Sequence, residues 1–182
     1  MKTIILAGGY GTRIAEYTQK IPKPMIKIGG IPLLTHIMRL FKSYGHNEFI
    51  IAAGYKKKII QDYYFQSKEF NNLKVIDTGK DTMTGGRLLR LKPFFEKNEI
   101  FFMTYGDGLS DINLNKLKQF HLKHGRIASV TAVRPPVRFG EMSIVKSRVS
   151  SFKEKPEIKS SWINGGFFIL NHKIFDLIKN DS

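Results

Sequence analysis

A stretch near the start of the chain reads Thr3-Ile4-Ile5-Leu6-Ala7-Gly8-Gly9-Tyr10-Gly11-Thr12-Arg13. The short apolar run is typical of a buried strand, and the glycines that follow are typical of a loop. Three glycines let main-chain N–H groups approach an anion closely, and Arg13 adds a guanidinium that can bind two phosphate oxygens. The stretch predicts a strand followed by a phosphate-binding loop. For the glycines alone, a tight turn that needs positive φ is the alternative.

This loop differs from the two common phosphate-binding motifs. No Gly-Lys-Ser/Thr follows, so it is not a Walker A loop, and Ile14 stands where the dinucleotide fingerprint has its third glycine. A second cation follows in Lys20-Ile21-Pro22-Lys23-Pro24-Met25. Because the two prolines restrict the backbone, the Lys23 ammonium has little freedom to lose on binding a phosphate. An incidental lysine in a surface loop is the alternative interpretation.

Apolar strands and amphipathic helices alternate along the chain, which indicates βαβ crossovers. The expected strands are 3–6, 49–53, 73–76, 100–104, 128–133 and 166–170, with a hairpin at 142–145 and 149–152; the expected helices are 33–44, 59–64, 114–124, capped by Asn113, and 173–179. The predicted fold is α/β and Rossmann-like, a mostly parallel open sheet with helices on both faces and a small β-hairpin. Because ligands bind beyond the carboxyl ends of parallel strands, the Gly8 and Gly106 loops should border one cleft.

Length and composition favour one compact domain over residues 1–182, since 42% of the 182 residues are hydrophobic. Thirty Lys and Arg against 15 Asp and Glu give a formal charge of +15, but the basic residues are scattered. We therefore expect a solvated lysine-rich surface that attracts small phosphorylated substrates, and no nucleic-acid site. The absence of cysteine excludes disulfides and thiolate chemistry. The first apolar run is too short for a signal peptide or a membrane span, which predicts a soluble cytoplasmic protein without a membrane partner.

Residues 6–13 together with Pro22-Lys23-Pro24-Met25 closely resemble the signature of the sugar-1-phosphate nucleotidyltransferases. Residues 77–88 look like the stretch that distinguishes the cytidylyltransferases acting on glucose 1-phosphate from their thymidylyl- and uridylyl-transferring relatives. Further similar segments are 104–108, 138–140, 154–156 and 164–168. They follow the family's order over nearly the whole chain, and together they are far more specific than any single piece.

The resemblance implies a reaction in which a sugar phosphate oxygen attacks the α-phosphorus of a nucleoside triphosphate in line and expels pyrophosphate. Such a reaction needs charge neutralisation and alignment. The implied catalytic residues are Arg13, Lys23 and Asp107, and Asp107 would also hold Mg²⁺ against the α-phosphate. The implied nucleotide-binding residues are Leu6, Ala7, Gly8, Gly9, Gly11, Thr12, Thr82, Arg87 and Gly106. The implied sugar-phosphate-binding residues are Glu154, Lys155, Asn164 and Gly165.

Some of these assignments have plain structural alternatives. Asp107 between two glycines can be a loop cap, and Glu154-Lys155 taken alone is more typical of an exposed charge pair. Family members usually run beyond the length of this chain, and the part without a counterpart here normally carries a second aspartate that completes the metal site.

Several functions therefore stay open at this stage. The first is a transferase that takes CTP and a sugar 1-phosphate, for which glucose 1-phosphate is the expected sugar and a homo-oligomer is one open form of assembly. The alternatives are a relative that uses UTP or dTTP, a non-catalytic nucleotide or nucleotide-sugar binding module, and a basic protein that binds nucleic acid.

Overall fold

The computed structural model describes residues 1–12, 15–135, 140–154 and 161–180. They form two compact units, the first made of Met1–Ser129 and Gly166–Ser182 and the second of Val130–Gly165. The single domain expected over residues 1–182 stays a prediction.

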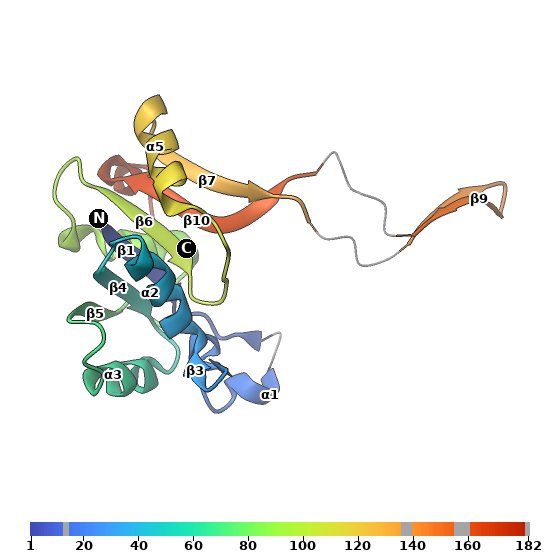
Figure 1. The fold of residues 1–182 in the computed structure, drawn as a ribbon. Helices are drawn as coiled ribbons and strands as arrows, with labels where there is room; N and C mark the ends of the chain where they lie inside the picture. Colours follow the sequence, from blue (N-terminus) through green and yellow to red (C-terminus); the bar gives the residue numbers. More distant parts are fainter. Residues whose placement is uncertain (13–14, 136–139, 155–160, 181–182) are drawn as a thin grey trace. The chain divides into compact units, whose positions relative to one another are not determined.

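A six-stranded sheet, in the order β5-β4-β1-β6-β10-β7, forms the centre of the fold (Figure 1). Its strands are β1 (Lys2–Ala7), β4 (Glu48–Ala53), β5 (Asn72–Asp77), β6 (Ile100–Tyr105), β7 (Ala128–Val133) and β10 (Ile163–Asn171). β1 runs parallel to β4 and β6, and β4 runs parallel to β5, whereas β10 runs antiparallel to β6. The mostly parallel α/β sheet predicted from the sequence is confirmed.

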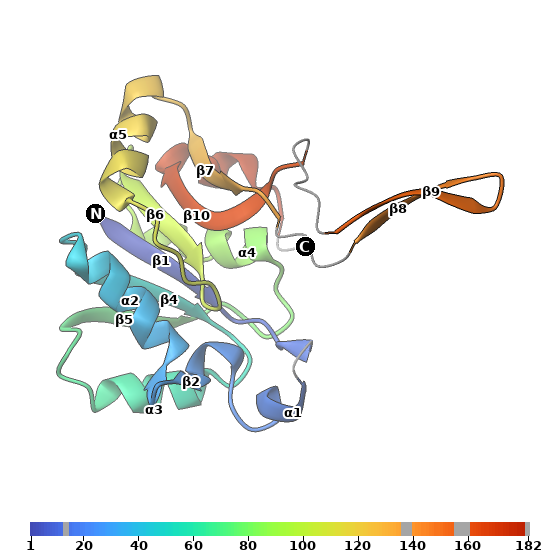
Figure 2. The same ribbon diagram turned by 45° about the vertical axis from the view of Figure 1, so that its right-hand side comes forward.

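Alternate residues of β1 point into two separate cores. Ile5 and Ala7 pack with one cluster, and Ile4 packs with the other. The first cluster draws on α2 (Leu33–Ser43), α3 (Lys57–Phe65) and α5 (Leu114–His124), and the second on α4 (Thr84–Leu89), η3 (Lys92–Phe94) and η4 (His172–Leu177). Figure 2 shows α2 and α4 on different sides of the sheet. A strand buried on both faces needs apolar residues at every position, which explains the continuous apolar run of β1.

The helix ends follow the expected signals. The Asn113 side chain accepts a hydrogen bond from the N–H of Lys116 at 3.0 Å, as an N-cap does. Gly125 ends α5 in the left-handed region at a φ of 61°, and Gly45 follows α2 at a φ of 81°. The predicted cap and both predicted stops are confirmed.

The last predicted helix is present in a tighter form. The helix expected over 173–179 is the 3-10 helix η4, and the Asn171 side chain caps it by accepting from the N–H of Lys173 at 3.0 Å. In a three-residue turn His172 and Phe175 lie above one another, with ring centres 5.3 Å apart. Phe175 is buried and its ring stacks on Phe101 at 5.7 Å, so packing favours the tighter helix.

Several short elements were not expected from the sequence pattern. They are α1 (Ala15–Thr18), η2 (Lys23–Met25), β2 (Lys27–Ile28), β3 (Ile31–Pro32), α4 and η3. Their lengths are below what a periodic apolar pattern can reveal.

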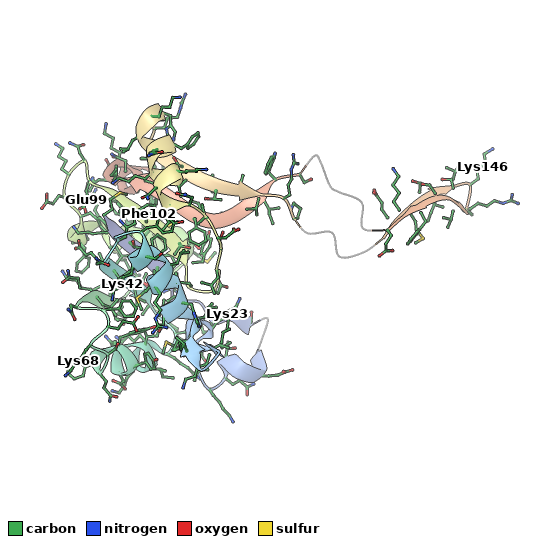
Figure 3. The ribbon with its side chains drawn as sticks, viewed as in Figure 1. Lys23, Lys42, Lys68, Glu99, Phe102 and Lys146 are labelled. Carbon is green, nitrogen blue, oxygen red and sulfur yellow. The ribbon has the colours of Figure 1, made fainter. Side chains whose placement is uncertain are left out.

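The second unit contains the predicted hairpin. β8 (Glu141–Val145) pairs antiparallel with β9 (Arg148–Lys153). Lys146 and Ser147 join them, with φ values of 46° and 62°, as in a tight two-residue hairpin turn. Lys146 stands at this turn in Figure 3. Among the residues placed by the structure, no helix is long and apolar enough to cross a membrane.

Candidate functional site

A cavity of about 490 Å³ opens at the carboxyl ends of β1 and β6 in the first unit. Its volume lies in the range of small-molecule sites, and its position is where open α/β sheets bind ligands. The Gly106 N–H donates to the Leu6 carbonyl oxygen at 2.9 Å, which brings the two loops together. The prediction that the Gly8 and Gly106 loops border one cleft is confirmed. The lining residues are Leu6, Ala7, Gly8, Gly9, Tyr10, Gly11, Thr12, Lys23, Pro24, Lys80, Asp81, Thr82, Met83, Thr84, Arg87, Tyr105, Gly106 and Asp107.

All nine residues predicted to bind the nucleotide line this cavity, and so do Lys23 and Asp107. Arg13 and Lys155 lie outside the described residues, as do Arg138 and Phe139 of the similar segment at 138–140. The remaining sugar-phosphate candidates belong to the second unit or its boundary.

Close packing explains two of the glycines at the cavity. A methyl group on Gly106 would lie 2.9 Å from Cγ of Pro24 and 3.1 Å from the Leu6 carbonyl oxygen. Gly11 has a φ of +68°, and its added Cβ would lie 2.7 Å from Cγ2 of Thr18. Only glycine permits these approaches, so the loop is fixed closely against its surroundings.

Arg87 of α4 is a buried cation in the cavity wall, with a relative exposure of 6%. Its Nη2 donates to the carbonyl oxygens of Gly8 at 2.9 Å and Lys80 at 3.1 Å. Its Nη1 donates to Oγ1 of Thr78 at 3.0 Å and to the Gly79 carbonyl oxygen at 2.5 Å. The guanidinium thus ties the end of β1 to the loop that follows β5.

These bonds give the Arg87 side chain a structural role in the cavity wall. Both Nη groups of the guanidinium donate to protein oxygens, and a Cβ on Gly8 would lie only 2.1 Å from Nη1. Burial lowers the pKa of Arg87, and the nearby positive charge of Arg90 acts in the same direction. Arg87 shapes the wall of the cavity, and its direct contact with a nucleotide stays a prediction.

Lys23 and Asp107 form an ion pair inside the cavity, with Nζ of Lys23 2.6 Å from Oδ2 of Asp107. Their side chains are 31% and 41% exposed, so both face solvent in the cleft. Lys23 begins η2, where the Met25 N–H donates to the Pro22 carbonyl oxygen at 2.8 Å, and Figure 3 labels its place in the fold. Two residues predicted to be catalytic, 84 positions apart in the sequence, are in contact.

Asp107 can supply one ligand to Mg²⁺, but one carboxylate does not make a complete metal site. No group of three His, Asp or Glu side chains gathers anywhere in the described ranges. Mg²⁺ typically keeps several waters and takes one or two carboxylates together with substrate phosphates. The residues present therefore fit a metal ion that arrives with a polyphosphate.

Tyr10 and Asp81 line the cavity, although no role was predicted for either residue within the 6–13 and 77–88 segments. The Tyr10 hydroxyl donates to Oδ1 of Asp81, and this bond raises the pKa of the phenol. The Tyr10 ring lies 5.1 Å from the Tyr55 ring, and Nζ of Lys80 lies 5.6 Å from its centre. The glycine-rich loop and the loop at 80–82 are thus connected twice. The exposed side chain of Tyr10 contacts Asp81 and Lys80, and the buried Arg87 bonds to both loops.

The residues of the second unit have contacts of their own. A Cβ on Gly165 would lie 2.9 Å from Cγ1 of Val133 and 3.0 Å from the Thr131 carbonyl oxygen, so this glycine allows close strand packing. The Arg134 guanidinium lies 3.8 Å from the centre of the Trp162 ring. The other two candidates, Glu154 and Asn164, are exposed.

The sequence pattern of a known family covers this site and the rest of the chain. The family described as "Nucleotidyl transferase" matches residues 2–182. The chain belongs to this nucleotidyl transferase family. A glucose-1-phosphate cytidylyltransferase of Salmonella typhi is 42% identical over 204 aligned residues, which cover 100% of this chain and 79% of the relative.

Other relatives agree with the nucleotidyl transferase assignment. A probable glucose-1-phosphate cytidylyltransferase of Bacillus subtilis (strain 168) is 39% identical over 203 aligned residues, again covering 100% of this chain and 79% of the relative. The crystal structure of HddC from Yersinia pseudotuberculosis has a TM-score of 0.76 at 27% identity, covering 100% of this chain and 81% of that one. The same HddC protein has also been solved in complex with GMP-PN. The nucleotidyltransferase class and the fold predicted from the sequence are confirmed.

Proposed function

We propose that this nucleotidyltransferase transfers the cytidylyl group of CTP to glucose 1-phosphate, forming CDP-glucose and pyrophosphate with the help of Mg²⁺. The observation that carries the proposal is the cavity in which the glycine-rich loop, Lys23 and Asp107 meet at the carboxyl ends of β1 and β6. The choice of cytidine and glucose is supported by relatives at 42% and 39% identity whose names state that activity.

The main chain of the glycine-rich loop suits the triphosphate. Gly8, Gly9 and Gly11 line the cavity without side chains, so a phosphate can come close to backbone N–H groups. Arg87 holds the Gly8 carbonyl oxygen at 2.9 Å, and the carbonyl therefore points into the wall and not toward the anion. In this proposal the loop binds and orients the nucleotide before the reaction.

Lys23 and Asp107 serve the reacting phosphate. A bound Mg²⁺ supplies positive charge that neutralises the phosphate oxygens and aligns them for in-line attack. Asp107 would hold that ion, and the Lys23 ammonium, released from its ion pair, would move to the phosphates. Both residues stabilise negative charge, and neither needs to form a covalent bond or remove a proton.

The test is pyrophosphate release with glucose 1-phosphate, Mg²⁺ and each of CTP, UTP, dTTP and ATP. We expect turnover with CTP, and a fall of about 100- to 1,000-fold in kcat for Asp107→Asn, because a group aimed at transition-state charge is lost. Asp62→Asn is the matched control, since Asp62 is an exposed carboxylate paired with Lys58 on α3 and does not line the cavity. CTP binding without turnover would leave only a nucleotide-binding module, and turnover with UTP or dTTP alone would reassign the base.

A further inference from the structure

Asp81 is the carboxylate of the cavity that the proposed chemistry does not use. Among the described lining residues only two carboxylates occur, and the other, Asp107, is paired with Lys23. Within the described chain, the hydrogen bond that Asp81 accepts comes from the Tyr10 hydroxyl. A second carboxylate is unexpected in a cavity proposed to bind the negatively charged triphosphate of a nucleotide.

Charge restricts what Asp81 can contact. A nucleoside triphosphate carries several negative charges on its phosphates, and a carboxylate beside them would repel them. Lys23, Lys80 and Arg87 provide the positive charge in the same lining. Asp81 is therefore suited to the uncharged part of the ligand, the base and ribose.

The chemistry of the group sets which atoms it can bind there. An ionised carboxylate only accepts hydrogen bonds, so its partner must be an N–H or O–H donor. The Tyr10 hydroxyl donates to Oδ1, and Oδ2, which accepts no hydrogen bond from the described residues, can accept one from a ligand.

Tyr10 is itself held in place, which makes it a suitable positioning residue for Asp81. Its ring lies against the Tyr55 ring at 5.1 Å, and the Lys80 ammonium lies 5.6 Å from its centre. A phenol that packs against a ring and an ammonium group restricts the carboxylate that it contacts. A carboxylate with fewer accessible orientations loses less entropy when a ligand donor binds it.

We propose that Asp81, oriented by Tyr10, reads the nucleoside by accepting a hydrogen bond from the exocyclic amino group of the base. This inference rests on the proposed function. Asp and Glu accept from the cytosine N4 amino group in nucleic-acid recognition, whereas uracil and thymine present a carbonyl oxygen there, which a carboxylate repels. Asp81 thus favours CTP over UTP and dTTP. A ribose hydroxyl offers the same donor chemistry, and the ligands of the test separate the two sources.

The experiment measures binding by calorimetry in the presence of Mg²⁺ and without sugar phosphate. The ligands are CTP, UTP, 2′,3′-dideoxy-CTP and inorganic tripolyphosphate, and the proteins are the wild type, Asp81→Asn, Tyr10→Phe and the control Asp62→Asn. Asp81 and Tyr10 are both exposed, so both variants should fold, which thermal melting verifies. We expect Asp81→Asn to weaken CTP about tenfold, with no loss for UTP or tripolyphosphate. Tyr10→Phe should act in the same direction by about threefold, because it removes the orientation and not the acceptor.

The ligand series separates the remaining outcomes. Equal losses for CTP and UTP with none for dideoxy-CTP would keep Asp81 as a nucleoside acceptor and move its partner from the base to the ribose. Equal losses for all four ligands, as a purely structural residue would produce, would overturn the inference, and so would unchanged binding of every nucleotide. If the wild type binds and turns over CTP in these cases, only the inference fails. If the wild type binds no nucleotide at all, the proposed function fails with it.

Discussion

Gly8 and Gly9 are adjacent in the glycine-rich loop, but the space beside Gly8 is filled and the space beside Gly9 is open. A Cβ on Gly8 would lie 2.1 Å from Nη1 and 2.4 Å from Cζ of Arg87, whereas a Cβ on Gly9 would meet nothing within 4 Å. The absence of a side chain at Gly8 therefore makes room for the buried guanidinium. At Gly9 it leaves open space at the cavity.

We expect Gly8→Ala to lower the free energy of unfolding by about 2 to 3 kcal/mol, because the added methyl displaces Arg87 from its carbonyl partners. Gly9→Ala should change it by less than about 0.5 kcal/mol, since the methyl meets no neighbour. Urea denaturation of the two variants beside the wild type measures the difference. Similar losses in both variants would show that the guanidinium does not set the requirement for glycine.

The position of Arg87 could be predicted from the sequence, but its contacts could not. The motif at 77–88 placed Arg87 at the nucleotide site, and the side chain does line the cavity. No pattern in the sequence shows that its Nη groups would donate to Gly8, Thr78, Gly79 and Lys80. Those contacts depend on how α4 meets the end of β1, which is a tertiary property. The contact between Tyr10 and Asp81 was missed for the same reason.

At the scale of elements, strands buried on both faces were the most predictable. β1, β4 and β6 are nearly continuous apolar runs because each packs against two cores. The direction of β10, antiparallel to β6, could not be predicted because an apolar run carries no sign of strand direction. α4 was missed because its first turn reads Thr84-Gly85-Gly86, which disfavours helix, and its formation depends on the burial of Arg87 and Leu88.

The junction of α2 and β4 contains a buried histidine, whose burial makes the stability of the fold depend on pH. His46 is 6% exposed, its ring lies 4.8 Å from the Phe102 ring, and its Nε2 has no hydrogen-bond partner in the described chain. Burial lowers the pKa of His46, and the positive charges of the N-terminus and Lys118 add to this effect. The folded protein therefore holds this imidazole neutral.

Acid should destabilise the fold through this histidine. The unfolded state binds a proton near the ordinary His pKa of about 6.5, while the folded state resists it to a lower pH. Stability is thus fully present above about pH 7.5 and falls as the pH drops through 6.5, by at most about 1.4 kcal/mol per pH unit for one group. Urea denaturation between pH 5 and 8 measures the free energy of unfolding. Below about pH 6.5 this free energy should fall less steeply with decreasing pH for His46→Leu than for the wild type. His36 is half-buried, with its Nε2 3.0 Å from the Ile28 carbonyl oxygen, and it supplies the control. If His36→Leu reduced the pH dependence to the same extent, His46 would not be its cause.

The protein as a whole carries a formal net charge of +15, which acts on anions at long range. Among the described residues, Lys23 and Lys80 are the lysines that line the cavity. Most of the other lysines lie outside it. Lys42 is exposed, and Figure 3 shows Lys68 at the edge of the first unit. Such charges make no contact with a ligand in the cavity, but their summed field raises the rate at which an anion reaches it.

This field predicts how nucleotide binding responds to salt. The association rate constant for CTP with Mg²⁺ should fall roughly tenfold between about 20 and 500 mM NaCl, because added ions screen charges beyond about 10 Å. The double variant Lys116→Glu and Lys123→Glu changes two exposed residues of α5 that do not line the cavity. It should slow association and reduce the salt dependence while leaving the dissociation rate unchanged, which stopped-flow fluorescence can resolve. A change confined to dissociation would mean that these lysines act through local contacts. Steeply salt-dependent binding of single-stranded oligonucleotides would instead assign the positive surface to nucleic acid.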